Sequence, residues 1–166
     1  MLAFAVPVQS QEATDPDVKA AFLFNFMKFV EWPSGVLPNS GPIAACVMGN
    51  SAVAESLAGA VKGRLVGGHQ IAVSKVTLDG PLRGCHVLYL SGADARLTQQ
   101  VTQLLRGLSV FTLSDFERFA VMGGVANFVV DNGRLRFAIN VDAVRRARLQ
   151  ISSRMLALAT IVNDEP

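Results

Sequence analysis

The sequence predicts a single-domain α/β sandwich: a mostly parallel, Rossmann-like sheet of about six strands, a C-terminal antiparallel hairpin, and helices on both faces. Three observations carry this prediction. Short apolar runs alternate with segments of helical periodicity, as in βαβ units. An Asn-Gly pair at residues 132–133 lies between two alternating runs, which is a strong hairpin signal. A chain of 166 residues, 51% of them hydrophobic, can bury one sizeable core but not two.

The first predicted element is a helix that begins at Asp15 and Pro16, because these residue types are favoured at the cap and in the first turn. Apolar residues recur at helical spacing from Val18 onward. Pro33 is expected to end the helix near residues 31–32, since proline disfavours α geometry in the residue before it.

Four strands are predicted between this helix and the hairpin, each as a short apolar or alternating run next to turn residues. They cover residues 43–48, 69–75, 85–90 and 110–113. Further helices are predicted from their apolar periodicity. They cover residues 51–61 with Asn50 or Ser51 as cap, residues 94–106, residues 116–121, a short basic stretch after Asn140 or Asp142, and residues 152–162. The inner face of the helix over residues 94–106 should comprise Leu97, Val101, Leu104 and Leu105.

The hairpin has two contrasting faces. If residues 132–133 form the turn, Phe128 lies opposite Phe137. The apolar face then contains Ala126, Phe128, Val130, Leu135, Phe137 and Ile139. The other face presents Asn127, Arg136 and Asn140. We expect a helix to cover most of this second face and to leave only its rim for recognition.

Charge and hydropathy exclude two classes of protein. The formal net charge is +2 and no basic block occurs, which argues against a nucleic-acid partner. No apolar run approaches the roughly 20 residues needed to cross a bilayer, so we expect no direct membrane insertion. Residues 1–13 resemble the end of a signal peptide without its positive start, or a disordered segment, and the folded domain should cover residues 14–164.

The chain offers few candidates for catalysis or metal binding. Cys85 and His86 are successive strand residues, so their side chains should point to opposite faces and cannot form a thiol–imidazole pair. Together with His69 and Cys46 they lack the short spacings of a zinc site. We therefore predict no catalytic residue, no metal and no cofactor.

Several polar residues have both a structural and a functional interpretation. Residues 48–51 follow a strand and open a helix, which suits ordinary turn chemistry better than a phosphate site, because the glycine-rich fingerprint is absent. Asp115 and Glu117 should complement a helix N-terminus. Trp32 should close one end of the core with Glu31 in solvent. Three basic side chains, Arg145, Arg146 and Arg148, should form a solvated stripe.

Cys46 and Cys85 are the only cysteines, and they are compatible with one disulfide or with two buried thiols. In common doubly wound sheets the first strand lies beside the third, and these strands carry the two cysteines. Adjacent strands bring Cα atoms to roughly 5 Å, which a disulfide accepts. Such a bond would suit an exported protein.

An ordered set of motifs resembles the YfiR-like family over about residues 17–160. The motifs are Asn25-Phe26-x-Lys28-Phe29-Val30-Glu31-Trp32-Pro33, Cys46-Val47-Met48-Gly49, Gly84-Cys85-His86-Val87-Leu88-Tyr89, Leu113-Ser114-Asp115, Gly123-Gly124, Gly133-Arg134-Leu135-Arg136-Phe137-Ala138-Ile139-Asn140 and Ile151-Ser152-Ser153-x-x-Leu156-x-Leu158-Ala159. The resemblance implies an exported bacterial protein with an α/β fold, and it implies that Cys46 and Cys85 form the family's long-range disulfide. The family's best-known member has a second, local disulfide where this chain has Ala120 and Asn127.

The resemblance also implies a function. We expect a non-enzymatic periplasmic protein that forms a homodimer, binds the periplasmic domain of a membrane-bound diguanylate cyclase, and lowers cyclic di-GMP synthesis and biofilm formation. The candidate partner or ligand surface comprises Glu31, Trp32, Asn50, Asn127, Arg136 and Asn140. An alternative is a periplasmic module that binds an amino acid or nucleotide in the crevice after the first and third strands. A third hypothesis is an enzyme that uses Asp115, Glu31 and His86.

Overall fold

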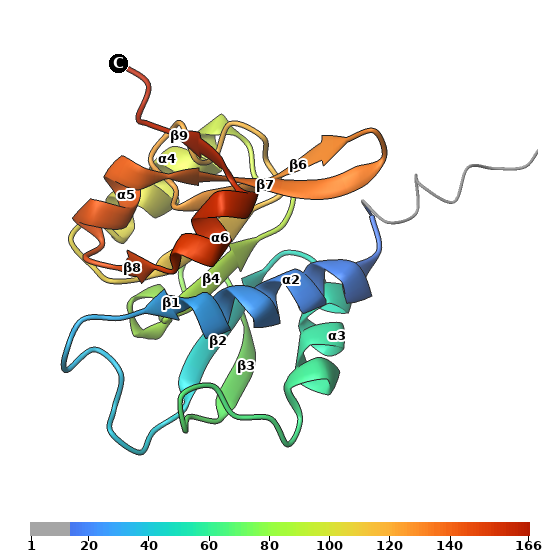
Figure 1. Cartoon of the computed structure of the whole chain (residues 1–166), viewed down its shortest axis with the longest axis vertical. Coiled ribbons are helices and arrows are strands. Elements are labelled where there is room, and N and C mark those ends of the chain that lie inside the picture. The colour runs from blue at the N-terminus through green and yellow to red at the C-terminus, as the bar shows by residue number, and fades with distance from the viewer. Residues whose placement is uncertain (1–13) are drawn as a thin grey trace, which may run out of the picture.

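The computed structural model describes residues 14–166 and shows an α/β sandwich built on a seven-stranded sheet (Figure 1). The sheet order is β3-β2-β4-β5-β6-β7-β9, and β1 and β8 form a separate two-stranded ribbon. The strands are β1 (Val30–Glu31), β2 (Ile43–Met48), β3 (Ile71–Val76), β4 (Val87–Leu90), β5 (Phe111–Ser114), β6 (Ala126–Asp131), β7 (Arg134–Asn140), β8 (Gln150–Ile151) and β9 (Thr160–Val162). The predicted fold class is confirmed, with β9 as an additional strand. The signal-peptide prediction for residues 1–13 lies outside the described residues.

The strand directions follow the predicted pattern. The strands from β3 to β6 are parallel, β6 and β7 form the antiparallel hairpin, and β9 runs parallel to β7. The first strand of the sheet, β2, lies between β3 and β4, as expected for a doubly wound order. Within the described residues, no helix combines the length and apolar character needed to span a membrane.

The helices are α2 (Pro16–Phe29), α3 (Ser51–Val61), α4 (Ala95–Leu104), α5 (Val141–Arg146) and α6 (Ser153–Leu158), with a short 3-10 turn, η1 (Leu82–Gly84). Each α-helix of the described residues begins with a side chain that accepts a backbone N–H, which satisfies one of its free donors. These caps are Asp15, Asn50, Asp94, Asn140 and Ser152. Helix α2 ends before the predicted boundary, because Val30 and Glu31 pair with β8.

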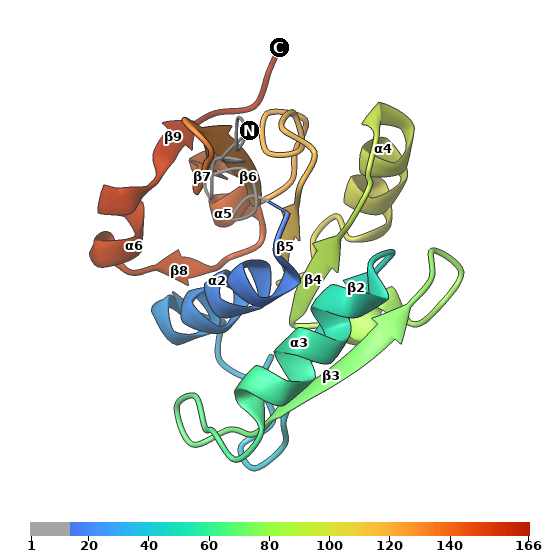
Figure 2. The same cartoon turned by 90° about the vertical axis from the view of Figure 1, so that its right-hand side faces the viewer.

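Two hydrophobic cores lie on opposite faces of the sheet. In β2, Ala45 and Val47 belong to the core that contains α2 and α3 side chains, whereas Cys46 and Met48 belong to the core that contains Val101 of α4. This alternation is the period-two pattern of a strand covered on both sides. Figure 2 shows α2 and α3 on one side of the strands and α4 on the other.

The hairpin register is confirmed. Phe128 pairs with Phe137 across β6 and β7, and Asn132 has the positive φ of 49° that this turn requires. Helix α2 packs on the apolar face: the ring of Phe26 lies 4.8 Å from that of Phe137, and the ring of Phe22 lies 5.6 Å from that of Phe128. Edge-on ring contacts of this kind add to the stability gained by burial.

The predicted helix over residues 116–121 is wrong, because this segment forms successive turns. Side chains from the hairpin bind backbone groups of this segment, and this explains why it is not helical. The side chain of Asn127 accepts the N–H of Ala120, and the side chain of Asn140 donates to the carbonyl of Ala120. In a helix over these residues, the N–H of Ala120 would instead donate to the carbonyl of Phe116.

The predicted helix over residues 152–162 is correct only in its first half. Helix α6 ends at Leu158, and Ala159 is extended, with φ −90° and ψ 151°. The β-branched residues that follow pair with β7 as β9, where Ile161 lies beside Ile139. Open backbone groups on β7 therefore determine the structure of residues 160–162 more strongly than their helical periodicity does.

The inner face of α4 differs from the prediction at one position. Leu104 is 41% exposed, and the buried stripe comprises Thr98, Val101 and Leu105. Thr98 can occupy the buried face because its hydroxyl donates to the carbonyl of Asp94 at 2.7 Å. The polar group is thus satisfied within the helix.

Candidate functional site

The two cysteines form the predicted disulfide. Their Sγ atoms are 2.02 Å apart and their Cα atoms 5.9 Å apart. Cys46 lies in β2, and Cys85 immediately follows η1, next to β4. Both residues are buried in the core beneath α4, so the bond joins two segments separated by 39 residues inside this core.

Two of the predicted surface residues are buried and hold the backbone. Asn127 is 1% exposed and Asn140 is 0% exposed. Asn127 Oδ1 accepts the N–H of Ala120 at 2.9 Å, and Asn140 Nδ2 donates to the carbonyl of Ala120 at 2.6 Å. The expectation of a covering helix is therefore wrong here, because the turn around Ala120 covers this part of the hairpin. Asn127 and Asn140 do not form an accessible surface in this structure.

A network of polar groups links Asn140 to residues near the end of the chain. The carboxylate of Asp164 accepts from Asn140 Nδ2 at 2.8 Å and from both terminal nitrogens of Arg146, one of them at 3.0 Å. The hydrogen bonds from Arg146 hold the pKa of Asp164 below its usual range. The same pairing raises the pKa of Arg146. Arg146 thus binds a carboxylate, whereas a purely solvated stripe was predicted.

Trp32 and His86 anchor the loop over residues 33–42. The indole N–H of Trp32 donates to the carbonyl of His86 at 3.2 Å. His86 Nδ1 accepts the N–H of Ala44 at 2.8 Å, and its Nε2 lies 3.2 Å from the carbonyl of Val36. Trp32 packs against the core, as predicted, while its neighbour Glu31 is exposed.

The crevice after β2 and β4 is narrow. A Cβ on Gly49 would lie 2.7 Å from the carbonyl oxygen of Ser91, so only glycine fits between these loops. Asp115 accepts from the N–H of Gly92 at 2.9 Å and pairs with Lys19 of α2 at 3.8 Å. Asp115 therefore acts as a structural junction and not as a helix cap.

A cavity of about 440 Å³ opens at the ends of β2 and β3, where Asn50 lies in the wall. The side chain of Asn50 is engaged as the cap of α3, accepting the N–H of Ala52 at 2.9 Å. Within residues 14–166, no three His, Cys, Asp or Glu side chains gather in a way that could hold a metal ion.

One edge of the sheet is open and partly apolar. Strand β9 pairs with β7 only from Ala138 onward, so among the described residues the outer side of Arg134–Phe137 has no strand partner. Beside it, Leu158 is 73% exposed and Ile161 is 47% exposed. We call β9, the first part of β7 and these two side chains the β7–β9 edge. Arg136, exposed on β7, pairs with Asp131 at 3.2 Å.

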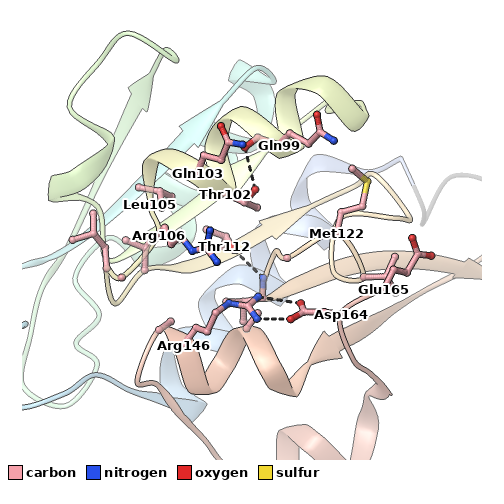
Figure 3. A pocket seen from close by; sticks show the side chains of 18 of the residues that line it. Gln99, Thr102, Gln103, Leu105, Arg106, Thr112, Met122, Arg146, Asp164 and Glu165 are labelled. Atoms are coloured by element: carbon pink, nitrogen blue, oxygen red, sulfur yellow. Dashed lines mark hydrogen bonds and ion pairs between the residues drawn. The ribbon is translucent and has the colours of Figure 1, made fainter.

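A second cavity, of about 480 Å³, lies between α4 and α5 (Figure 3). Its floor includes three buried apolar side chains, Leu105, Val110 and Val125. Polar side chains from α4, α5, the loop after α4 and the last residues form its rim; these are Gln99, Gln103, Arg106, Arg146, Asp164 and Glu165. We call this the α4–α5 cavity. Of these residues, sequence reasoning considered only Arg146, because the six come from four separate segments with no shared motif.

The structure does not gather the six predicted surface residues into one site. Glu31 and Trp32 lie near β1, and Asn50 lies at the carboxyl end of β2. Arg136 lies on the hairpin, and the two buried asparagines lie beneath the turn around Ala120. A partner surface that includes the accessible members of the set stays a prediction.

Comparison with solved structures supports the fold. A conserved domain protein from Vibrio cholerae O1 biovar El Tor superposes with a TM-score of 0.53 and 14% identity, over 89% of this chain and 60% of that one. An ABC domain in complex with L-Trp from Streptococcus pneumoniae gives a TM-score of 0.51 and 9% identity, over 74% of this chain and 55% of that one. The chain thus spans less than two thirds of either structure, and at these identities the likeness concerns the fold alone.

The family model described as YfiR/HmsC-like matches residues 16–160, which include six strands of the seven-stranded sheet, the first residue of β9 and both cysteines of the disulfide. The family comprises periplasmic, regulatory, non-catalytic domains connected with diguanylate cyclases. The match agrees with the motif order found in the sequence, and the chain belongs to the YfiR/HmsC-like family.

Proposed function

We propose that this protein is a periplasmic regulator that binds the periplasmic domain of an inner-membrane diguanylate cyclase and inhibits it, lowering cyclic di-GMP and biofilm formation. Membership of the YfiR/HmsC-like family is the observation that carries the proposal. The disulfide between Cys46 and Cys85 supports it, because disulfides persist in oxidising compartments such as the periplasm. In this proposal the protein acts by binding and not by catalysis.

The β7–β9 edge is the docking surface that we propose for the cyclase. Its unpaired backbone groups can accept an added strand, which is a common mode of peptide recognition. Leu158 and Ile161 offer exposed apolar area beside that backbone. Arg134 is exposed there and has no ion-pair partner among the described residues, so an extended segment with apolar and acidic side chains would suit this edge.

The test is a pull-down of the cyclase's periplasmic domain with Ile161→Lys and Leu158→Glu variants. We expect either change to weaken binding at least tenfold and to restore cyclic di-GMP in cells, because each places a charge in the apolar part of the interface. Leu65→Glu is a matched control: Leu65 is 60% exposed but follows α3, near the opposite end of the sheet. Binding that survives both edge variants would exclude this surface, and a cyclase that binds no form of the protein would exclude the function.

We also propose that the protein forms a homodimer. The sheet has two outer strands, β3 and β9, and β3 carries Lys75, a residue type that protects edges from pairing. A second copy would therefore compete with the cyclase for β9. Light scattering of the wild type and of Ile161→Lys tests this: a dimer unaffected by the substitution would place the contact elsewhere.

The alternative, a module that binds an amino acid or nucleotide in the crevice after β2 and β4, is less well supported. The close approach of Gly49 to Ser91 leaves no space for a ligand between these two loops. The junction formed by Asp115 and Lys19 lies at the same edge of the sheet. Thermal-shift measurements with amino acids and nucleotides, repeated on an Asn50→Ala variant, separate this alternative from the regulator.

A further inference from the structure

The α4–α5 cavity has the dimensions and composition of a small-molecule site. Its volume of about 480 Å³ falls within the range typical of ligand pockets. Leu105, Val110 and Val125 provide an apolar floor, beside the buried hydroxyl of Thr112, which accepts the N–H of Val125; the charged and amide groups lie around the rim. An apolar base with a few convergent polar groups favours a ligand that is itself amphipathic.

Gly123 keeps one side of the cavity open. Its φ of 111° lies in a region that residues with side chains rarely adopt. A Cβ at this position would lie 3.7 Å from Thr102 of α4 and 3.8 Å from the guanidinium of Arg146 on α5. A side chain here would therefore occupy the space between the two helices that the cavity uses.

The charges at the rim are unequally compensated. The guanidinium of Arg146 is neutralised by Asp164, and Glu165 is paired with Arg118 at 2.5 Å. Arg106 has no ion-pair partner among the described residues, and Figure 3 shows its side chain extending from the loop after α4 into the cavity. The amides of Gln99 and Gln103 on α4 line the same rim. The site thus offers one uncompensated positive charge beside two neutral hydrogen-bonding groups.

We propose that the α4–α5 cavity binds a small organic monoanion with an apolar body, whose carboxylate pairs with Arg106 and whose body lies over Leu105, Val110 and Val125. The neighbouring guanidinium of Arg146 already binds a carboxylate: Asp164 accepts hydrogen bonds from Arg146 and from Asn140. Pairing of a carboxylate with an arginine is thus already present at this end of the cavity. This site lies between α4 and α5 and shares no lining residue with the β7–β9 edge, so it does not depend on the proposed cyclase contact.

Phenylacetate and its neutral isostere phenylacetamide are matched probes for the purified protein. Isothermal titration should show saturable binding of phenylacetate in the millimolar range or tighter, and weaker binding of the amide. Amide chemical shifts in NMR should change at residues of α4, α5 and the turn around Gly123. Shifts that cluster elsewhere would overturn the location of the site.

Three variants test the roles of Arg106 and Asp164 and the location of the ligand in the cavity. Arg106→Gln should weaken phenylacetate about tenfold and leave phenylacetamide unchanged, because only the charged probe uses the guanidinium. Asp164→Asn should raise the preference for phenylacetate over the amide, since Arg146 is then no longer neutralised. Gln103→Trp, at an exposed rim position, should block both probes without disturbing the core.

Arg64→Gln is the control, because Arg64 is an exposed arginine after α3 that does not line the cavity. It should leave both affinities unchanged. Equal affinity for the acid and the amide, a selectivity that survives Arg106→Gln, or no saturation by either probe would overturn the proposal. None of these results involves the cyclase, so they are distinguishable from a failure of the proposed function.

Discussion

Asn127 and Asn140, on neighbouring strands of the hairpin, both form hydrogen bonds with the backbone of Ala120. Asn127 accepts its N–H at 2.9 Å, and Asn140 donates to its carbonyl at 2.6 Å. Positions 120 and 127 are those at which the resemblance places a local disulfide in the family's best-known member. In this chain a hydrogen bond from the N–H of Ala120 to the side chain of Asn127 joins the two positions.

Asn127→Ala should lower the free energy of unfolding by about 1–3 kcal/mol, because it leaves the buried N–H of Ala120 without an acceptor. Urea unfolding measures the change. Asn39→Ala, in the exposed loop before β2, is the control and should cost little. Equal effects of the two substitutions would show that the bond to Ala120 does not stabilise the turn.

Gly124→Ala should destabilise the protein by about 1–3 kcal/mol through overpacking. A Cβ on Gly124 would lie 2.1 Å from Cε1 of Phe119, whose ring is fully buried and cannot move aside. Gly84→Ala is a matched control, since no atom lies within 4 Å of the corresponding Cβ. Thermal denaturation of both variants tests the prediction, and a Tm for Gly124→Ala as high as that of Gly84→Ala would contradict it.

The elements that the sequence predicts well are those with strong local signals. The turn at residues 132–133 determines the hairpin register, and the continuous apolar run of β2 identifies a strand covered on both faces. Caps such as Asp15 and Asn50 mark helix starts because each satisfies a free N–H locally.

The errors arise where distant residues compete for backbone groups. Nothing near residues 116–121 reveals that two asparagines of the hairpin take the N–H and carbonyl of Ala120. Likewise, β9 and the ribbon of β1 with β8 depend on partners far along the chain. The α4–α5 cavity was not predicted for the same reason, because tertiary packing alone brings Arg106 near Arg146.

Replacing both cysteines by alanine should lower the free energy of unfolding by about 3–4 kcal/mol, the value expected for a loop of this length on the chain-entropy model. The disulfide closes a loop between residues 39 positions apart. For a chain of 166 residues, this corresponds to a fall in Tm of about 10 °C. Reductant should lower the Tm of the wild type and leave the Cys46→Ala/Cys85→Ala variant unchanged; a reductant-insensitive wild type would contradict the prediction.

His86 should make stability depend on pH in the mildly acidic range. The N–H of Ala44 can only donate, so Nδ1 of His86 must be unprotonated, and Nε2 carries the proton toward the carbonyl of Val36. Burial lowers the pKa of His86 below its usual value of 6.5, and the nearby His69 lowers it further, although the hydrogen bond to Val36 opposes the shift. Protonation would place a second N–H against that of Ala44.

Because the pKa of His86 is lower in the folded protein, the unfolded chain binds more protons as the pH falls below about 6.5. The free energy of unfolding should therefore be constant above this pH with respect to His86 and should decrease below it, until the folded form also protonates. Urea unfolding between about pH 7.5 and pH 5 measures the slope. His86→Gln should flatten it, since glutamine does not titrate, whereas His69→Gln, which removes the neighbouring imidazole but leaves His86 in place, should leave most of it. A slope that is the same in the wild type and in His86→Gln would show that another group controls acid sensitivity, because the glutamine variant lacks the proton linkage of His86.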